Sequence, residues 1–128
     1  MNGESLARNI KIVAELNDVL KYKFRKLHTK IVKKMNSASL SSIINMLFEQ
    51  DIIGANDMKA LRKFRDDPPE QCGELLTLLH TSGNREAFVQ LHLAMESDKN
   101  LKLLVEEINN CTCQDSIMTK TFPLLFLE

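Results

Sequence analysis

Apolar residues recur at alternating steps of four and three through the first quarter of the chain. The stripe consists of Leu6, Ile10, Val13, Asn17, Leu20, Phe24, Leu27 and Ile31. Its one polar member, Asn17, lies in the middle. This spacing is that of one face of a helix, and it predicts either a single helix over 5–35 or two helices bent near Asn17 and Asp18.

Two further helices are predicted in the next segment. Ser39 is expected to cap the first of them, and Gly54-Ala55 interrupt the chain before Asn56 caps a short one. The inner positions expected for these two helices are Leu40, Ile43, Ile44, Leu47 and Phe48, then Met58, Leu61 and Phe64.

A fourth and a fifth helix are predicted to form a tight corner. Asp67 is the expected N-cap of the fourth and Pro68 its first residue, where the missing N–H costs no hydrogen bond. Gly83 suits the left-handed backbone that ends a helix, and Asn84 suits the N-cap of the fifth. The apolar positions are Leu75, Leu76, Leu78 and Leu79, then Ala87, Phe88, Leu91, Ala94 and Met95.

A sixth helix is expected from about Lys99, capped by Ser97 or Asp98. Leu101, Leu104, Val105 and Ile108 form its apolar side. Beyond Asn109 the periodicity ends, so 110–128 is predicted to be a loose, irregular tail. Its apolar end is too short to span a membrane and could dock on a groove or a partner, although a terminus without a function is the expectation.

Composition agrees with a helical domain and adds an uneven charge distribution. The chain has 128 residues, 44% hydrophobic but only 5% aromatic, with four glycines and three prolines. These proportions favour one all-α domain. The formal net charge is zero, yet the segment from Lys21 to Lys34 holds seven cations and no acid. The surface is therefore expected to be electrically two-sided.

The corner segment resembles a known family. A leucine-rich helix, a turn with Gly83, then Glu86-Ala87-Phe88 and Ala94-Met95-Glu96-Ser97 are similar to the fourth and fifth helices of caspase recruitment domains, or CARDs. Upstream, the segment 47–53 followed by 56–58 and Leu61 resembles that family's second helix running into its third. The resemblance covers roughly 18–109. It implies a six-helix antiparallel death-fold bundle with Greek-key topology, preceded by a helical extension over 1–17.

The resemblance also implies how such a domain works. A basic face of one CARD meets an acidic face of another, and repeated contacts build helical assemblies. The residues expected on the basic face are Arg25, Lys26, Lys30 and Lys33, to which Arg62, Lys63 and Arg65 are added. The residues expected on the acidic face are Glu49, Asp51 and Asp57. The fourth helix departs from the family pattern, because 68–80 contains no Lys or Arg.

The expected partner is therefore another CARD-containing protein, such as an initiator caspase or an apoptosome-type or inflammatory adaptor, with self-association as a further outcome. Catalysis is not expected, because the caspase Gln-Ala-Cys-x-Gly signature and a phosphate-binding glycine loop are both missing. No cofactor or metal is expected either, because Cys111 and Cys113 lack a second ligand pair. Three cysteines without a framework spacing, and no recognisable signal segment, favour a reduced cytoplasmic protein.

Two alternatives use the N-terminal part of the chain. The basic first helix suits nucleic acid or anionic lipid, although the neutral overall charge argues against both. The stripe from Leu6 to Ile31 also suits a coiled-coil dimer, although it provides fewer heptads than such dimers normally need. Regulation of apoptosis or inflammatory signalling through CARD contacts remains the main expectation.

Overall fold

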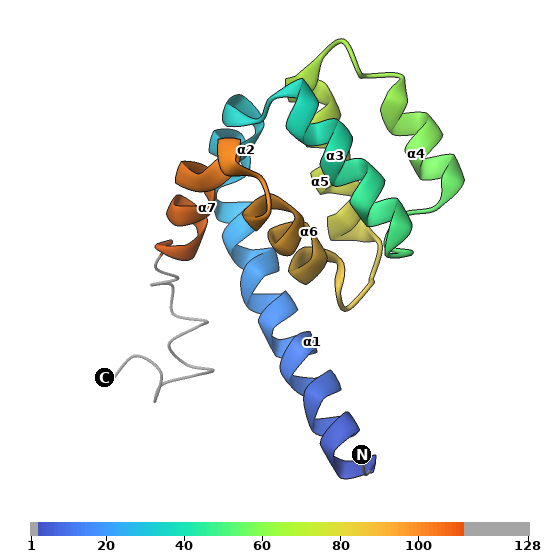
Figure 1. Ribbon diagram of the computed structural model, residues 1–128, viewed down its shortest axis with the longest axis vertical. Coiled ribbons are helices and arrows are strands. Elements are labelled where there is room, and N and C mark those ends of the chain that lie inside the picture. Colours follow the sequence, from blue (N-terminus) through green and yellow to red (C-terminus); the bar gives the residue numbers. More distant parts are fainter. Residues whose placement is uncertain (1–2, 112–128) are drawn as a thin grey trace.

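The computed structural model describes residues 3–111, with side chains described from Ile10 onward. Every regular element in this part of the chain is helical, which confirms the predicted all-α class. The elements, shown in Figure 1, are α1 (Gly3–Lys26), α2 (His28–Lys34), α3 (Ser37–Glu49), α4 (Ala55–Arg62), α5 (Pro68–Thr81), α6 (Ala87–Glu96), the 3-10 turn η1 (Lys99–Leu101) and α7 (Lys102–Asn109). The predicted tail lies almost wholly outside the described residues.

The N-terminal stripe forms two helices, but the break is ten residues later than the predicted bend. Helix α1 continues straight through Asn17 and Asp18 and ends at Lys26, and Leu27, with φ −100° and ψ 15°, separates it from α2. The two helices remain linked, because Leu27 N–H donates to the Lys23 carbonyl at 3.0 Å and Ile31 N–H donates to the Leu27 carbonyl at 2.9 Å. Asn17 causes no bend because its side chain bonds to another helix.

Helix boundaries confirm part of the predicted capping. Asp67 Oδ1 accepts from Glu70 N–H at 3.3 Å, with Pro68 as the first residue of α5. Gly83 has a φ of 70°, so the corner turns where a left-handed residue was expected. Asp98 Oδ1 accepts from Asn100 N–H at 2.9 Å and so caps η1.

Three other predicted caps are wrong. Asn36, rather than Ser39, caps α3, because Asn36 Oδ1 accepts from Ser39 N–H at 2.8 Å. Helix α4 begins at Ala55 rather than after Asn56, and the Asp57 carboxylate accepts from Gly54 N–H at 3.0 Å. Helix α6 begins at Ala87, and Asn84 only accepts from Glu86 N–H at 2.8 Å in the preceding turn.

One core contains nearly all the predicted inner positions of α3 to α7. Phe88 is at its centre, with ring centroids 5.6 Å from Phe24 and 4.7 Å from His80. Leu78 and Phe64 are only half-buried. The prediction for Phe48 is wrong, because this side chain is 40% exposed. It lies at the margin of the α3 stripe in the last turn of the helix, and the residues that follow it, 49–51, are exposed as well.

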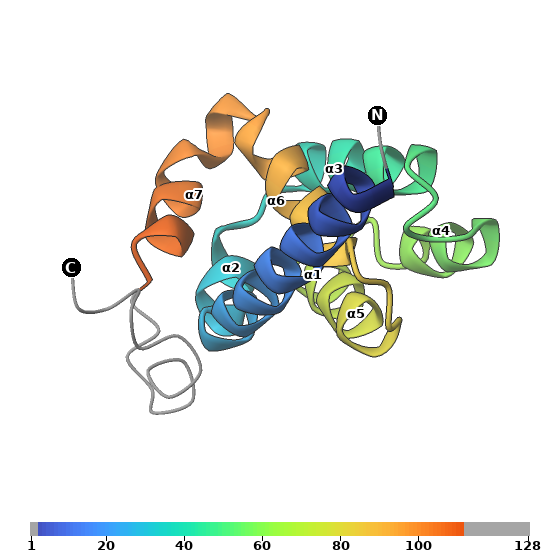
Figure 2. The same ribbon diagram turned by 90° about the horizontal axis from the view of Figure 1, so that it is seen from below.

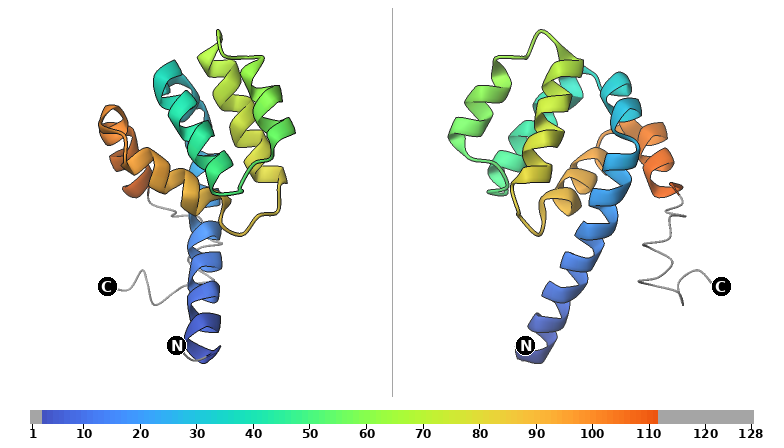
Figure 3. Two further views of the ribbon diagram at one scale, coloured as in Figure 1. Left: turned by 45° about the vertical axis from the view of Figure 1, so that its right-hand side comes forward. Right: turned by 180° about the vertical axis from the view of Figure 1, so that it is seen from behind.

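Helix α1 packs mainly against α6, in front of which it crosses in Figure 2, and its N-terminal half extends beyond the bundle, as Figure 1 and Figure 3 show. On this half, Ile10 is 56%, Ile12 54% and Leu16 47% exposed. The predicted boundary between an extension and the domain falls inside this continuous helix, between residues 17 and 18.

Asn17 fixes where α1 crosses α6. Only 5% of its surface is exposed, and its Oδ1 accepts from Phe88 N–H at 2.8 Å and Val89 N–H at 3.4 Å. The first N–H groups of a helix have no partner within that helix. Asn17 therefore supplies from α1 the acceptor that an N-cap side chain normally supplies from the helix's own start.

We expect Asn17→Ala to lower the free energy of unfolding by about 1–3 kcal/mol, because it leaves buried N–H donors without an acceptor. The amides of Phe88 and Val89 should also exchange faster with deuterium. The matched control is Asn45→Ala, which removes an exposed amide on α3 and should change stability by less than about 0.5 kcal/mol. Equal effects of the two substitutions in urea titration would contradict the role given to Asn17.

Candidate interaction surfaces

The first basic cluster lies where α1 meets α2. Arg25 and Lys26 occupy the last turn of α1, where cations interact favourably with the helix dipole, and Lys33 lies on α2. All three side chains are exposed, and none has an ion pair with another described residue. Lys26 Nζ lies 5.7 Å from the centre of the Tyr22 ring. These cations are available to a partner.

Other cations of the same run hold α7 in place. Lys34 Nζ lies 2.6 Å from Glu107 Oε1, and Lys30 Nζ lies 3.4 Å from Glu107 Oε2. The hydrogen bond from Lys34 is the main reason that the pKa of Glu107 falls below its ordinary value. Lys30, expected on the partner-binding face, is therefore engaged within the molecule, although its side chain remains 54% exposed.

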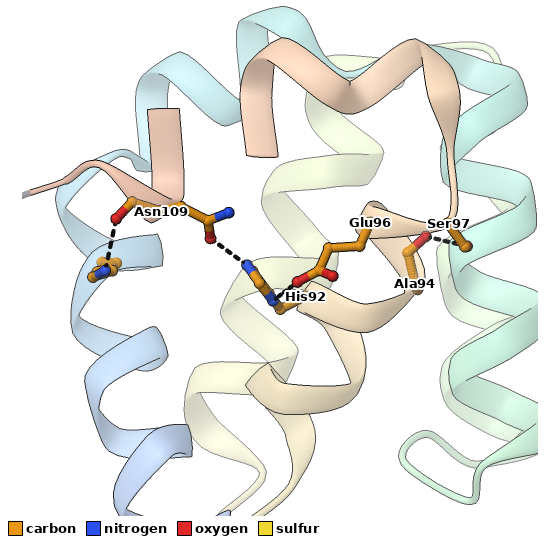
Figure 4. A network of polar contacts seen from close by, with 6 residues as sticks. His92, Ala94, Glu96, Ser97 and Asn109 are labelled. Atoms are coloured by element: carbon orange, nitrogen blue, oxygen red, sulfur yellow. Dashed lines mark hydrogen bonds and ion pairs between the residues drawn. The ribbon is translucent and has the colours of Figure 1, made fainter. Parts of the chain in front are cut away.

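A polar network continues this attachment to α1 and α6. Lys23 Nζ donates to the Asn109 carbonyl at 3.2 Å, at the C-terminal end of α7. His92 Nε2 lies 2.7 Å from Asn109 Oδ1, and His92 Nδ1 lies 2.7 Å from Glu96 Oε1. Figure 4 shows Asn109 and Glu96 on the two sides of the His92 ring. Nothing in the sequence pattern pointed to this pairing of distant residues.

The remaining predicted cations form a separate cluster. Arg62 is the last residue of α4, and Lys63 and Arg65 follow in the turn before α5. All three are exposed. Helices α2 and α4 both contact α5 and lie on opposite sides of it, as the right-hand view of Figure 3 shows. The structure therefore does not bring these three residues together with Arg25, Lys26 and Lys33.

The predicted acidic residues lie together at the connection between α3 and α4. Glu49 ends α3, Asp51 follows with a left-handed φ of 60°, and Asp57 belongs to the first turn of α4. Glu49 and Asp51 are exposed and have no ion pair among the described residues. Asp57 is half-buried and accepts from Gly54 N–H, so its carboxylate is partly used by the fold.

Cysteine and histidine side chains were the candidate catalytic and metal-binding groups. Burial in α5 raises the pKa of the Cys72 thiol to about 12, so this cysteine is not a ready nucleophile. His28, His80 and His92 lie on α2, α5 and α6 respectively. Within residues 3–111 no three His, Cys, Asp or Glu side chains are grouped as metal ligands would be. No helix in the same region has the length and apolar character needed to cross a membrane.

Comparison of the chain with models of protein families, with curated proteins and with solved structures finds no match.

We expect the cations of the first basic cluster to be detectable through His80. Partial burial lowers its pKa below the ordinary 6.5, and Lys21, Arg25 and His28 lower it further because they repel the protonated ring. Replacement of Arg25 by Gln should therefore raise the pKa of His80 in an NMR titration. Lys33→Gln, which removes a cation that does not contribute to this shift, should leave it unchanged.

The lowered pKa also sets the direction of the pH dependence of stability. The unfolded chain binds a proton at His80 more tightly than the folded protein does, so the free energy of unfolding should fall as the pH drops below about 6.5. In Arg25→Gln this loss should be smaller. A His80 pKa that rises equally in both variants would contradict the local origin of the effect.

Proposed function

We propose that this chain is a CARD-type interaction module that recruits or regulates partner proteins through charged faces. The helix order supports the proposal: α1 and α2 together stand for a kinked first helix, α3 to α6 for the second to fifth, and η1 with α7 for the sixth. On this proposal the bundle has the six-helix death-fold topology. The partner would be a CARD-containing initiator caspase or adaptor, or a second copy of the chain, and the setting apoptotic or inflammatory signalling in the cytoplasm.

The position of the two charged faces is the observation that carries the proposal. Arg25, Lys26 and Lys33 lie at the α1–α2 end, and Glu49 and Asp51 lie at the α3–α4 connection on the other side of the bundle (Figure 1). A contact between two different patches on opposite sides of a molecule joins copies head to tail, as rings or open filaments. It propagates, so such a module adds copies in a row.

The energies of these contacts suit a reversible assembly. An exposed ion pair contributes about 0–1 kcal/mol and is weakened by salt. Charged faces mainly guide the encounter and reject wrong partners. One contact is therefore weak, and stable complexes require several copies together.

The test is sedimentation of the full chain at low and high salt with variants that reverse each face. R25E/K26E reverses the basic face and E49K/D51K the acidic one. Each should weaken self-association at least about tenfold at low salt, because attraction becomes repulsion. A mixture of the two variants should restore alternating assembly, because every face of one variant is then opposite in charge to the face it meets on the other. The same substitutions should abolish capture of a CARD partner.

The control is K99E/K102E, which reverses two exposed cations at the starts of η1 and α7 that belong to neither face. It should assemble like the original chain. Unchanged association of R25E/K26E, or a loss of helical circular dichroism in it, would refute the proposal. Salt-dependent binding of unrelated DNA or anionic vesicles would instead favour the nucleic-acid or lipid alternative.

A second candidate function is dimerisation through α1. The observation that favours it is the exposure of Ile10, Ile12 and Leu16 on the protruding half of the helix. Ile10 also lines, with Val13 and Ala14, one wall of a groove whose other wall is Asn84, Arg85 and Glu86. A helix from another copy could bury these apolar side chains.

If α1 mediates dimerisation, replacement of Ile10, Ile12 and Leu16 by Gln should convert a salt-insensitive dimer to a monomer without unfolding the bundle. The matched control replaces Lys11 and Glu15, two exposed polar residues of the same turns, by Gln and should keep the dimer. Light scattering distinguishes the results. A chain that is monomeric at high salt before any substitution would exclude this candidate.

A further inference from the structure

A polar hollow of about 270 Å³ lies between α3 and the end of α4. It is lined by Ser37, Ser41, Ile44, Asn45, Arg62, Arg65 and Gln71. Ser37, Ser41 and Asn45 are four residues apart, so they occupy one face of α3. Arg62 and Arg65 project from a single turn, in which Arg65 N–H donates to the Arg62 carbonyl at 3.2 Å. Two arginines therefore line the hollow together with a row of hydroxyl- and amide-bearing residues.

The charge of these two arginines is not balanced within the described part of the chain. Neither Arg62 nor Arg65 has an ion pair there, although Asp66 and Asp67 follow them directly in sequence. Ser37 is also the first residue of α3, a helix of 13 residues, so the positive end of a helix dipole lies at the same hollow. The charged residues that line the hollow, Arg62 and Arg65, are both positive.

The walls of the hollow are held by the core. Gln71 is buried, and its Nε2 donates to the Leu61 carbonyl at 2.9 Å, which ties α5 to the end of α4. Ile44, also buried, belongs to the core face of α3. The two sides that carry the polar groups are therefore positioned before any ligand arrives, which reduces the entropy lost on binding.

We infer that this hollow binds a phosphate monoester, carried as a phosphorylated side chain on a partner protein. Guanidinium groups pair with phosphate oxygens through charge-assisted hydrogen bonds, and the serine hydroxyls and the Asn45 amide can donate to the remaining oxygens. The volume is below the roughly 300–1,000 Å³ of sites that enclose a small molecule, so a single charged group fits better than a whole metabolite.

The surroundings favour a phosphorylated protein over a membrane or a nucleic acid. Asp66, Asp67 and Glu70 are exposed next to the hollow in sequence. Such carboxylates would be repelled by an extended anionic surface or a phosphate backbone, whereas one phosphate on a partner's side chain can enter between the helices. The inference is independent of the recruitment proposal, because it uses neither Arg25 and Lys26 nor Glu49 and Asp51.

The experiment is an NMR titration of the full chain with capped O-phosphoserine, and with capped serine as the unphosphorylated probe. We expect saturable shifts of the Ser37, Ser41 and Asn45 amides with phosphoserine only. R62Q/R65Q should weaken binding at least about tenfold. The matched control is K59Q/K63Q, which removes two exposed cations of the same region that do not line the hollow, and it should bind like the original chain.

Two further measurements separate the inference from general charge attraction. Binding should weaken as the pH falls below about 6, because the phosphate monoester then loses one of its two charges while the arginines stay protonated. If R62Q/R65Q does not fold, Ser41→Asp serves instead, because it places a carboxylate beside the arginines and should block the probe.

An equal loss of phosphoserine affinity in R62Q/R65Q and K59Q/K63Q would overturn the inference. Arg62-dependent co-sedimentation with phosphatidylserine vesicles, without phosphoserine binding, would also overturn it.

Discussion

The hydrogen bonds from Asn17 to the start of α6 are the contact on which the arrangement of the bundle depends. An apolar stripe alone allows one helix to slide along another by a turn at little cost, because neighbouring positions are similar. A buried amide oxygen that must meet the Phe88 and Val89 N–H groups permits one position only. The Phe24 and Phe88 rings then meet in the core, and the N-terminal half of α1 is left beyond the bundle.

The cations of one basic run differ in their contacts within the molecule. Lys23, Lys30 and Lys34 hold the end of α7 through Asn109 and Glu107, whereas Arg25, Lys26 and Lys33 make no ion pair with a described residue. Some members of the segment therefore stabilise the fold, and others leave their charge exposed. A substitution in this segment has different consequences at neighbouring positions, so its effect on binding can be interpreted only together with its effect on α7.

The sequence predicted the helical class, the buried positions of α5 to α7 and the corner at Gly83, because each depends on local periodicity or on one residue's backbone preference. The predictions were wrong where a contact with a residue distant in the sequence determines the local structure. A bend was predicted near Asn17, but its side chain accepts a hydrogen bond from Phe88 N–H at the start of α6. Ser39 was predicted to be an N-cap, but its hydroxyl donates to Asp98 Oδ2 at 2.5 Å. The predicted basic face divided into two clusters for the same reason, since the placement of α4 across α5 is a tertiary property.

Because Cys72 is buried, its reactivity reports how often the helical bundle opens. The residue is 1% exposed, and burial raises the pKa of its thiol to about 12, so a modifying reagent reaches the reactive thiolate only when α5 separates from the core. The rate at which this sulfur is alkylated therefore measures how often the bundle opens. A partner that binds only the closed form would slow that rate by the same factor by which it reduces the open population, so binding of a partner could be followed without any attached label.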